Sequence, residues 1–270
     1  MKKILVTGAG GFVGSRVMQQ WAGHYELCPF PKGFLATAGE DAVRQAVLQQ
    51  CPDVILHTAA ISDTGYCADH PEQAYRANVE LPVWFARAAA ETGAKLVAFS
   101  SDQVYAGVEQ SGPLPETIPL QPANVYGQGK LEMEQRVLDR QPDSVLLRAE
   151  WMYDYISPRG NYLLNVLNAE ETLTFGKQYR GITYLREVCE NMERVIKLPG
   201  GVYNFGSETT QSMYEITKEF LRITGSRQQV QEGSAVHNLW MDCGKAAEHG
   251  VVFSGVMDGL KRCLGDYGLI

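Results

Sequence analysis

The chain has 270 residues, of which 45% are hydrophobic and 20% charged, and its formal net charge is −7. This length suits one large α/β domain, or one domain that carries a smaller lobe, and the composition is ordinary for a globular protein. Lys and Arg are scattered among acidic residues, which argues against a broad nucleic-acid-binding surface. No apolar run approaches the roughly 18 residues of a membrane span. From the charge distribution and the apolar runs together, we expect neither nucleic acid nor membrane as a partner.

The amino terminus, MKKILVTGAGG, begins with basic and then apolar residues, as a secretory signal does. Its apolar run from Ile4 to Val6 is far shorter than the roughly 7–15 residues of a signal's hydrophobic region. We therefore predict a first strand here and a cytoplasmic protein. The six cysteines form no CxxC pair, and we expect free thiols. Asp63, Cys67 and His70 could share a helical face, but no second ligand pair accompanies them, so we predict no metal site.

Strands and helices alternate from the amino terminus to Trp151. Short apolar runs that end in turn residues predict strands, and apolar residues at helical spacing predict helices. The expected strands are KILVT, YELCPF, DVILHTAA, KLVAFSS and SVLLRAEW. The expected helices are one beginning near Val13, then EDAVRQAVLQQ, AYRANVELPVWFARAAAETG and YGQGKLEMEQRVLDR. This alternation predicts an α/β protein with a Rossmann-type, doubly wound parallel sheet.

The alternation breaks after Trp151. GVYNFGS predicts a late strand, and SMYEITKEFLRITG predicts an amphipathic helix. We therefore predict a dinucleotide-binding domain of residues 1–153 with a return segment of about 181–206. Residues of about 154–180 and 207–270 would form a smaller C-terminal substrate lobe.

A glycine-rich turn, TGAGGFVG, follows the first strand and opens the first helix. Glycine permits the tight turn, lets a pyrophosphate approach the backbone, and lets the helix pack closely on the strand, while first-turn N–H groups face the phosphates. We predict cofactor contacts at Gly8, Gly11, Phe12, Val13 and Gly14. The alternative is a tight strand-to-helix turn that binds nothing, because a glycine triplet alone is weak evidence.

The second strand ends in LCPFPKGF, where Lys32 is the only charged residue. A site for NAD usually carries an acidic residue about 20 positions after the glycines, where it holds the ribose hydroxyls. The absence of Asp and Glu here slightly favours NADP over NAD, with Lys32 beside the 2′-phosphate. The alternative for Lys32 is a solvated loop lysine.

Two Tyr-x-x-x-Lys pairs occur, Tyr126 with Lys130 and Tyr214 with Lys218, and both place the two residues one helical turn apart. Tyr126 opens the helix after the fourth strand, whose end carries Ser100 and Ser101. In a doubly wound fold the carboxyl ends of the strands form the ligand crevice. We therefore predict that the first pair is catalytic. The second pair belongs to a helix with packing residues such as Ile216, Phe220 and Leu221, so we assign it to structure.

The motifs VTGAGGFVG, DVILHTAA, RANVE, FSSDQVYAG, NVYGQGKLEME, LLRAEWMYD, GVYNFGS and NLWMDCGKAAEHG together run from residue 4 to about residue 250. In this combination the chain resembles an extended short-chain dehydrogenase/reductase, and within that superfamily the dTDP-4-dehydrorhamnose reductase group. The resemblance implies an NAD(P)-dependent oxidoreductase that reduces a keto group on a sugar or nucleotide-sugar.

The resemblance also implies residue roles. Tyr126 would donate a proton to the carbonyl oxygen, and Ser101 would orient that carbonyl. Lys130 would bind the nicotinamide ribose, and its charge would favour tyrosinate. Asn78 would support the site, although a packing amide is an equal alternative. The remaining implied cofactor contacts are Thr58, Ala59, Ala60 and Ser100.

Some residues differ from those usual in the dTDP-4-dehydrorhamnose reductase group, and these differences leave alternative functions open. Related reductases often read LRTSWVYG where this chain has LRAEWMYD, which adds Glu150 and Asp154 near the nicotinamide end. An arginine expected near Val236 and His237, to help hold a nucleotide diphosphate, is missing. The alternatives are a nucleotide-sugar epimerase or dehydratase, and a non-catalytic NAD(P)-binding regulatory subunit like that of methionine adenosyltransferase. A homodimer is common in the superfamily, and the oligomeric state stays open.

Overall fold

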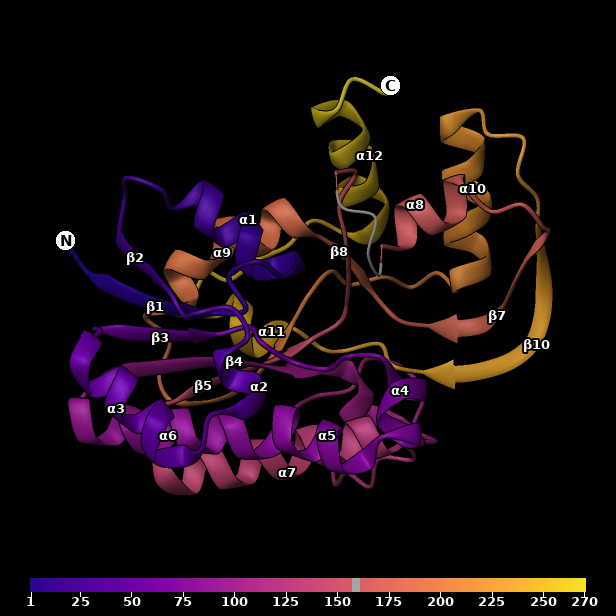
Figure 1. Ribbon diagram of the computed structural model, residues 1–270. Helices are drawn as coiled ribbons and strands as arrows, with labels where there is room; N and C mark the ends of the chain where they lie inside the picture. The colour runs from indigo at the N-terminus through magenta and orange to yellow at the C-terminus, as the bar shows by residue number, and fades with distance from the viewer. Residues whose placement is uncertain (157–160) are drawn as a thin grey trace.

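A six-stranded parallel sheet forms the centre of the computed structural model, which describes residues 1–156 and 161–270 (Figure 1). The strand order is β2-β1-β3-β4-β5-β9, and every neighbouring pair is parallel. The strands are β1 (Lys3–Thr7), β2 (Glu26–Pro29), β3 (Val54–His57), β4 (Lys95–Ser101), β5 (Val145–Ala149) and β9 (Gly201–Phe205). The predicted doubly wound sheet is confirmed, including the late strand GVYNFGS as its edge.

Helices cover both faces of this sheet, which explains why its inner strands β1, β3, β4 and β5 are mainly apolar on both sides. Ile4 and Val6 of β1 pack on one face with α1 (Phe12–Gln20) and α9 (Leu185–Val195). Leu5, between them, packs on the opposite face with α3 (Glu40–Gln50) and α6 (Leu81–Thr92). α7 (Val125–Arg140) lies beside α6 on that second face (Figure 1). Successive strand side chains thus alternate between two apolar cores.

The helix predicted over residues 74–93 is divided into three parts. They are α5 (Pro71–Tyr75), a π-helical turn η1 (Arg76–Glu80) and α6. Pro82 lies in the first turn of α6, where its missing N–H costs least. Gly93 ends α6 with φ of 73°, as the sequence indicated. π-helical turns interrupt the regular hydrogen-bond pattern and often occur at functional sites.

The remaining elements of the amino-terminal half are short. They are α2 (Phe34–Thr37), α4 (Thr64–Asp69) and the 3₁₀ turn η2 (Asp102–Tyr105). The predicted strand SVLLRAEW is in fact two strands, because Glu150 separates β5 from β6 (Trp151–Tyr153). β6 leaves the main sheet and pairs with β8 (Ile182–Tyr184).

The rest of the chain builds a second layer beside the carboxyl edge of the sheet (Figure 1). A parallel pair of β7 (Leu173–Tyr179) and β10 (Val230–Asn238) is the longest ladder there. It accompanies α8 (Tyr162–Leu167), α10 (Met213–Thr224) and α12 (Val256–Asp266), whereas the short helix α11 (Gly244–Ala247) packs against the core of the main sheet. Tyr153, Tyr162, Phe220 and Leu260 belong to the buried core of this layer.

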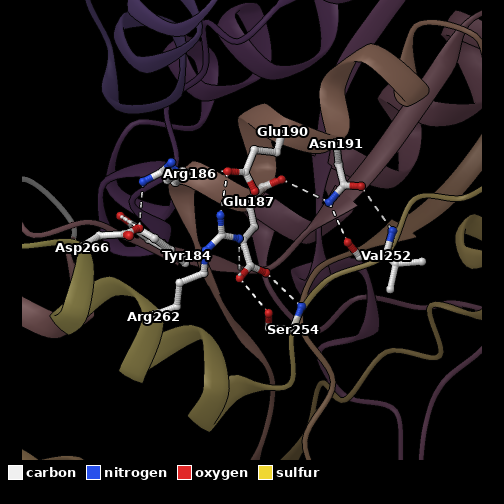
Figure 2. Close-up of polar contacts among 9 residues, drawn as sticks. All are labelled: Tyr184, Arg186, Glu187, Glu190, Asn191, Val252, Ser254, Arg262 and Asp266. Carbon is white, nitrogen blue, oxygen red and sulfur yellow. Dashed lines mark hydrogen bonds and ion pairs between the residues drawn. The ribbon is translucent and has the colours of Figure 1, made fainter.

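Polar contacts tie α12 and the segment before it to α9 (Figure 2). The buried carboxylate of Glu187 accepts hydrogen bonds from the Ser254 backbone N–H and hydroxyl, and from Arg262. The Asn191 side chain bonds both backbone groups of Val252. Because α9 lies on the main sheet, these contacts fasten the C-terminal helix to the sheet domain.

A second tie joins the carboxyl end of the chain to α1. Arg16 of α1 lies 3.0 Å from the Asp154 carboxylate and donates to the Tyr267 hydroxyl at 2.9 Å. Tyr267 in turn donates to Asp154 at 2.7 Å. Asp154 is thus committed to a structural ion pair with the flank of α1.

No helix among the described residues combines the length and the apolar character that a membrane span requires.

Candidate active site

Strands are added to the sheet on one side of β1 by β2 and on the other side by β3. In this fold the ligand crevice is expected at that switch in strand order, outside the carboxyl ends of β1 and β3. The glycine turn lies there. Gly8 has φ of +65°, and a Cβ at this position would meet Thr58 Oγ1 at 2.8 Å and the Ala59 nitrogen at 2.9 Å. A Cβ on Gly14 would collide with the Gly8 carbonyl oxygen. The turn therefore requires glycine at both positions, for conformation and for close packing.

The first turn of α1 is open to an anion. Its N-cap is Gly11, whose backbone N–H donates to Gly8 O at 2.7 Å; no side chain caps the helix, and its first turn carries no acidic residue. The N–H groups of Phe12 and Val13 lack partners within the helix and lie at its positive end. These residues fit the pyrophosphate of a dinucleotide.

The segment after β3 lies against the glycine turn. Thr58 Oγ1 donates to the Thr7 carbonyl at 2.7 Å, and the Ala59 N–H donates to Thr7 Oγ1 at 3.3 Å. Ala60 follows and is exposed.

Lys32 lies beyond the end of β2, next to β1, and is also exposed. The structure gives it no polar partner among the described residues, so its side chain is available to a ligand.

Tyr126 and Lys130 lie together beneath the same edge, and only 7% and 2% of their surfaces are exposed. The Lys130 ammonium is 5.7 Å from the centre of the Tyr126 ring and donates to the Phe99 carbonyl at 2.8 Å. Asn124 caps α7 by accepting from the Gly127 N–H at 2.7 Å. A Cβ on Gly127 would collide with the Gln103 carbonyl, so the start of α7 packs directly on η2.

Ser101 completes a trio with this pair. Its side chain hydrogen-bonds the Tyr126 phenol, and its hydroxyl donates to Asp102 Oδ1 at 3.1 Å. The Tyr214–Lys218 pair has different surroundings, on the surface of α10. Lys218 is exposed and Tyr214 is partly exposed, while Ile216 and Phe220 of the same helix are fully buried. The helix α10 is therefore amphipathic, as predicted.

Burial controls the acidity of the pair. It raises the pKa of Tyr126, the nearby Asp102 carboxylate raises it further, and the Ser101 hydrogen bond opposes them. Burial also lowers the pKa of Lys130 to about 8. The pKa of Tyr126 is raised rather than lowered, which is opposite to the expectation that Lys130 would favour tyrosinate, because burial is the largest influence on the phenol. Tyr126 holds its proton at neutral pH.

Asn78 and Ser100 are both engaged with protein groups. Asn78, in the π-helical turn, exchanges two hydrogen bonds with the backbone of Ile61 and so fixes the segment after β3. Ser100 donates to Glu134 at 2.6 Å. Whether either residue also contacts a cofactor stays a prediction.

Glu134 and Arg148 form a buried ion pair next to Ser100. Two Arg148 nitrogens donate to the Glu134 carboxylate, the shortest contact being 2.7 Å, and both side chains are at most 4% exposed. Arg148 also donates to the Tyr105 hydroxyl at 2.8 Å, and Tyr105 donates to Asn204. This network ties α7 to β5, η2 and β9 immediately behind the crevice.

Two residues that the sequence did not single out, Asp102 and Arg180, form an ion pair beside Ser101. Arg180 Nη2 lies 2.6 Å from Asp102 Oδ2. No pattern in the sequence connects them, because they are 78 residues apart. Proximity of Asp102 to Ser101 in the chain was the one available signal.

Glu150 is buried between two glycines. A Cβ on Gly181 or on Gly206 would collide with its carboxylate, which accepts hydrogen bonds from the Thr183 hydroxyl and the Ser207 N–H. Burial raises the pKa of this carboxyl to about 8, although both hydrogen bonds oppose the rise. Glu150 is therefore largely protonated at neutral pH.

We expect Glu150→Gln to flatten the pH dependence of stability between pH 5 and pH 8. The pKa of Glu150 is higher in the folded chain than its ordinary value of 4.5. Its contribution to stability is therefore complete below about pH 4.5 and is lost as pH rises towards 8. The wild-type chain should lose roughly 3–5 kcal/mol relative to the variant across this window. Urea unfolding at each pH measures this difference.

The exposed residue Glu109 offers a control, because Glu109→Gln should leave the wild-type profile unchanged. His57, whose pKa burial lowers to about 3, contributes equally to all three proteins. Parallel profiles for wild type and Glu150→Gln would show that Glu150 is already ionised at neutral pH.

The described residues contain no group of three His, Cys, Asp or Glu side chains placed to hold a metal ion. Asp63 instead caps α4 by accepting from the Tyr66 N–H, and His70 stacks on Tyr66.

Comparison with known proteins gives the family. The model of the RmlD substrate binding domain matches residues 1–239. The chain belongs to the RmlD substrate binding domain family. With its fold and site motifs, it is an extended short-chain dehydrogenase/reductase of the dTDP-4-dehydrorhamnose reductase-like type.

Three curated proteins illustrate what this chain is similar to. The spore coat polysaccharide biosynthesis protein SpsK of Bacillus subtilis is 28% identical over 83% of the chain and 80% of that protein. The dTDP-4-dehydrorhamnose reductase of Mycolicibacterium smegmatis is 35% identical over 56% of the chain, and the match spans only 46% of that enzyme. Methionine adenosyltransferase 2 subunit beta of Danio rerio is 29% identical over 80% of the chain and 72% of that protein.

Among solved structures, dTDP-4-dehydrorhamnose reductase of Bacillus anthracis in complex with NADP superimposes with a TM-score of 0.88. It is 22% identical, and the match covers 98% of each chain. At this identity the likeness shows that the two chains share the fold.

Proposed function

We propose that this member of the RmlD family is an NAD(P)H-dependent reductase of a keto group on a nucleotide-linked sugar. The observation that carries the proposal is the trio of Ser101, Tyr126 and Lys130, buried together at the carboxyl edge of the sheet, beside a glycine turn that suits a dinucleotide. Relatives that are named as dTDP-4-dehydrorhamnose reductases support the substrate class, and a fold neighbour bound to NADP supports the cofactor.

Each residue of the trio has a separate role in the proposed reduction. A reduced nicotinamide supplies the hydride for the carbonyl carbon when the cofactor is bound. Ser101 holds the carbonyl oxygen by a hydrogen bond. Tyr126 gives its proton to that oxygen as the carbonyl becomes an alcohol, because its raised pKa keeps the phenol protonated at neutral pH. Lys130, which donates to the Phe99 carbonyl, would bind the nicotinamide ribose.

The proposal extends to the organisation of the chain. Residues 1–153 and about 181–206 would bind the dinucleotide, and about 154–180 and 207–270 would bind the sugar. The positions of β9 and α9 on the main sheet support this division. A cytoplasmic location, which suits a consumer of NADPH, and a homodimer complete the proposal.

A non-catalytic role is the second candidate, because the similarity to methionine adenosyltransferase 2 subunit beta extends over 80% of the chain. A turnover assay distinguishes the reductase function from the non-catalytic role. Purified protein with NADPH and dTDP-4-dehydrorhamnose should oxidise the cofactor and release a reduced sugar. Cofactor binding without oxidation of NADPH by any nucleotide-linked keto-sugar would leave the regulatory role in its place.

We expect Lys32→Ala to weaken NADPH binding by about tenfold and to leave NADH binding unchanged. An exposed lysine at a 2′-phosphate contributes a charge-assisted hydrogen bond of this order. Titration calorimetry measures both affinities, with Lys197→Ala as a control at another exposed lysine. Equal losses for the two cofactors, or no loss for either, would exclude Lys32 from recognition of the phosphate.

A further inference from the structure

Glu150 is enclosed where three segments of the chain meet. It follows β5, and a Cβ on Gly181 or on Gly206 would collide with its carboxyl group. Its hydrogen-bond partners are the Thr183 hydroxyl and the Ser207 backbone N–H, neither of which carries a charge. Only 6% of the residue is exposed. The carboxyl group therefore stays among protein groups whether it is neutral or ionised.

One cation serves two acids in this part of the site. The Arg180 guanidinium lies 2.6 Å from Asp102 Oδ2, and its charge also acts on Glu150. The side chains of Arg180 and Asp102 are 16% and 3% exposed. One guanidinium balances one carboxylate, and a second buried carboxylate without its own counter-ion is costly. Glu150 therefore keeps its proton while Asp102 holds Arg180, and its pKa is raised accordingly.

The other titratable groups around this cluster add no charge at neutral pH. Burial raises the pKa of the Cys243 thiol and of the Tyr153 phenol, and both groups interact with Glu150. Burial lowers the pKa of His237, which interacts with Arg180. The charge of the cluster therefore depends on its two carboxyl groups and its one guanidinium.

Arg180 has unused donors for a second partner. Its guanidinium has five N–H groups, and the structure records one hydrogen bond, from Nη2 to Asp102 Oδ2. Nε is buried and has no partner among the described residues. Arg180 also precedes Gly181, whose backbone lies against the Glu150 carboxyl group. An ionised Glu150 would thus have free donors of Arg180 close by.

The partner of Arg180 matters to the trio of Ser101, Tyr126 and Lys130. Ser101 donates to Asp102 Oδ1 at 3.1 Å, while Arg180 holds Oδ2. Ser101 also hydrogen-bonds the Tyr126 phenol, whose pKa the Asp102 charge raises. Departure of the guanidinium would leave the whole Asp102 charge beside both hydroxyls. The phenol would then be a weaker proton donor.

We propose that Glu150 and Asp102 share Arg180, and that loss of the Glu150 proton draws the guanidinium from Asp102 towards Glu150. Glu150 is thus a positioning residue that acts on the trio through Arg180 and Asp102. Because Glu150 ionises as the pH rises through about 8, the observed pairing belongs to lower pH and the alternative pairing to higher pH. The competing explanation is a buried acid that has no effect on Arg180.

Trp151 reports on the guanidinium without any substrate, because the guanidinium carbon of Arg180 lies 5.2 Å from the centre of its ring. Its emission is the difference between wild type and Trp151→Phe. This emission should change with a midpoint near pH 8. Glu150→Gln, which cannot ionise, should show no transition, and Glu109→Gln, at an exposed glutamate, should keep it. Lys130→Met should also keep it, although burial lowers the pKa of Lys130 to about 8 as well.

Asp102→Asn tests the sharing itself and does not depend on the folding of Glu150→Gln. It removes the competing carboxylate, so Arg180 becomes free to pair with Glu150, and the midpoint should fall by at least about one pH unit. The proposal would be overturned by an unchanged midpoint in Asp102→Asn, by a transition that persists in Glu150→Gln, or by a wild-type emission that does not change with pH.

Turnover then tests the coupling to the trio, and this step rests on the proposed function. Above pH 8 the kcat of wild type should fall below that of Glu150→Gln, by about threefold or more at pH 9. Lys130 titrates in both proteins, so its effect cancels in the comparison. Identical kcat profiles would overturn the coupling. Because the emission measurements need no substrate, their outcome is independent of the assay that judges the reductase function.

Discussion

Replacement of Tyr126 by phenylalanine is expected to lower turnover by about 10²- to 10⁴-fold, the usual contribution of a positioned general acid. The variant keeps the ring that packs among Cys67, Ala74 and Ile61, so folding should be preserved. Only the hydroxyl that bonds Ser101 is lost. NADPH affinity should stay within about twofold of wild type, because the phosphate-binding turn is untouched. Steady-state kinetics with the keto-sugar and a separate NADPH titration measure the two effects.

The chain supplies its own control for this experiment. Tyr214 precedes Lys218 by the same spacing, and its ring lies 5.6 Å from the lysine nitrogen, but on the surface of α10. Tyr214→Phe should therefore turn over as wild type. A Tyr126→Phe variant that retained more than about a tenth of wild-type activity would exclude Tyr126 as the proton donor.

Loss of the Glu134 charge should cost about 3–5 kcal/mol of the free energy of unfolding. Glu134→Gln keeps the shape of the side chain but leaves the Arg148 guanidinium buried without its counter-ion. The penalty comes from that uncompensated charge, since both side chains are almost inaccessible to water. Urea unfolding at neutral pH measures the change.

Glu132 in the same helix is the matched comparison. It forms an exposed ion pair with Arg136, and both side chains are about 40% exposed. Glu132→Gln should cost no more than about 1 kcal/mol. If the two glutamine variants were equally stable, the Glu134–Arg148 network would not be the element that holds α7 against β5.

The sequence predicted the features that depend on local pattern. Alternating apolar runs identified the five strands of the first half, and the glycine spacing identified the turn that a Cβ on Gly8 or Gly14 would block. Context also separated the two Tyr-x-x-x-Lys pairs, because only Tyr126 follows a strand that ends in the crevice. Each of these patterns lies within a short stretch of the sequence, so it can be recognised without the fold.

The features that the sequence did not predict depend on distant parts of the chain. Asp102 and Arg180 meet because β4 ends beside the turn between β7 and β8. Glu150 seemed to be an added acid near the cofactor, but Gly181 and Gly206 enclose it. The expected direction of the Tyr126 pKa shift was wrong because the depth of burial, which is the largest influence on that pKa, follows from the complete fold.

The order in which segments enter the structure has a consequence for synthesis. The main sheet receives its last strand, β9, only at Gly201–Phe205, and α9 covers one of its faces from Leu185 onward. The ties to Arg16 and Glu187 come later still, from Tyr267 and Arg262. A nascent chain therefore cannot complete the main sheet until Phe205 has left the ribosome, and the ties to Arg16 and Glu187 form only after that. We expect protection of the main sheet from proteolysis to appear once β9 has emerged, rather than progressively from β1 onward.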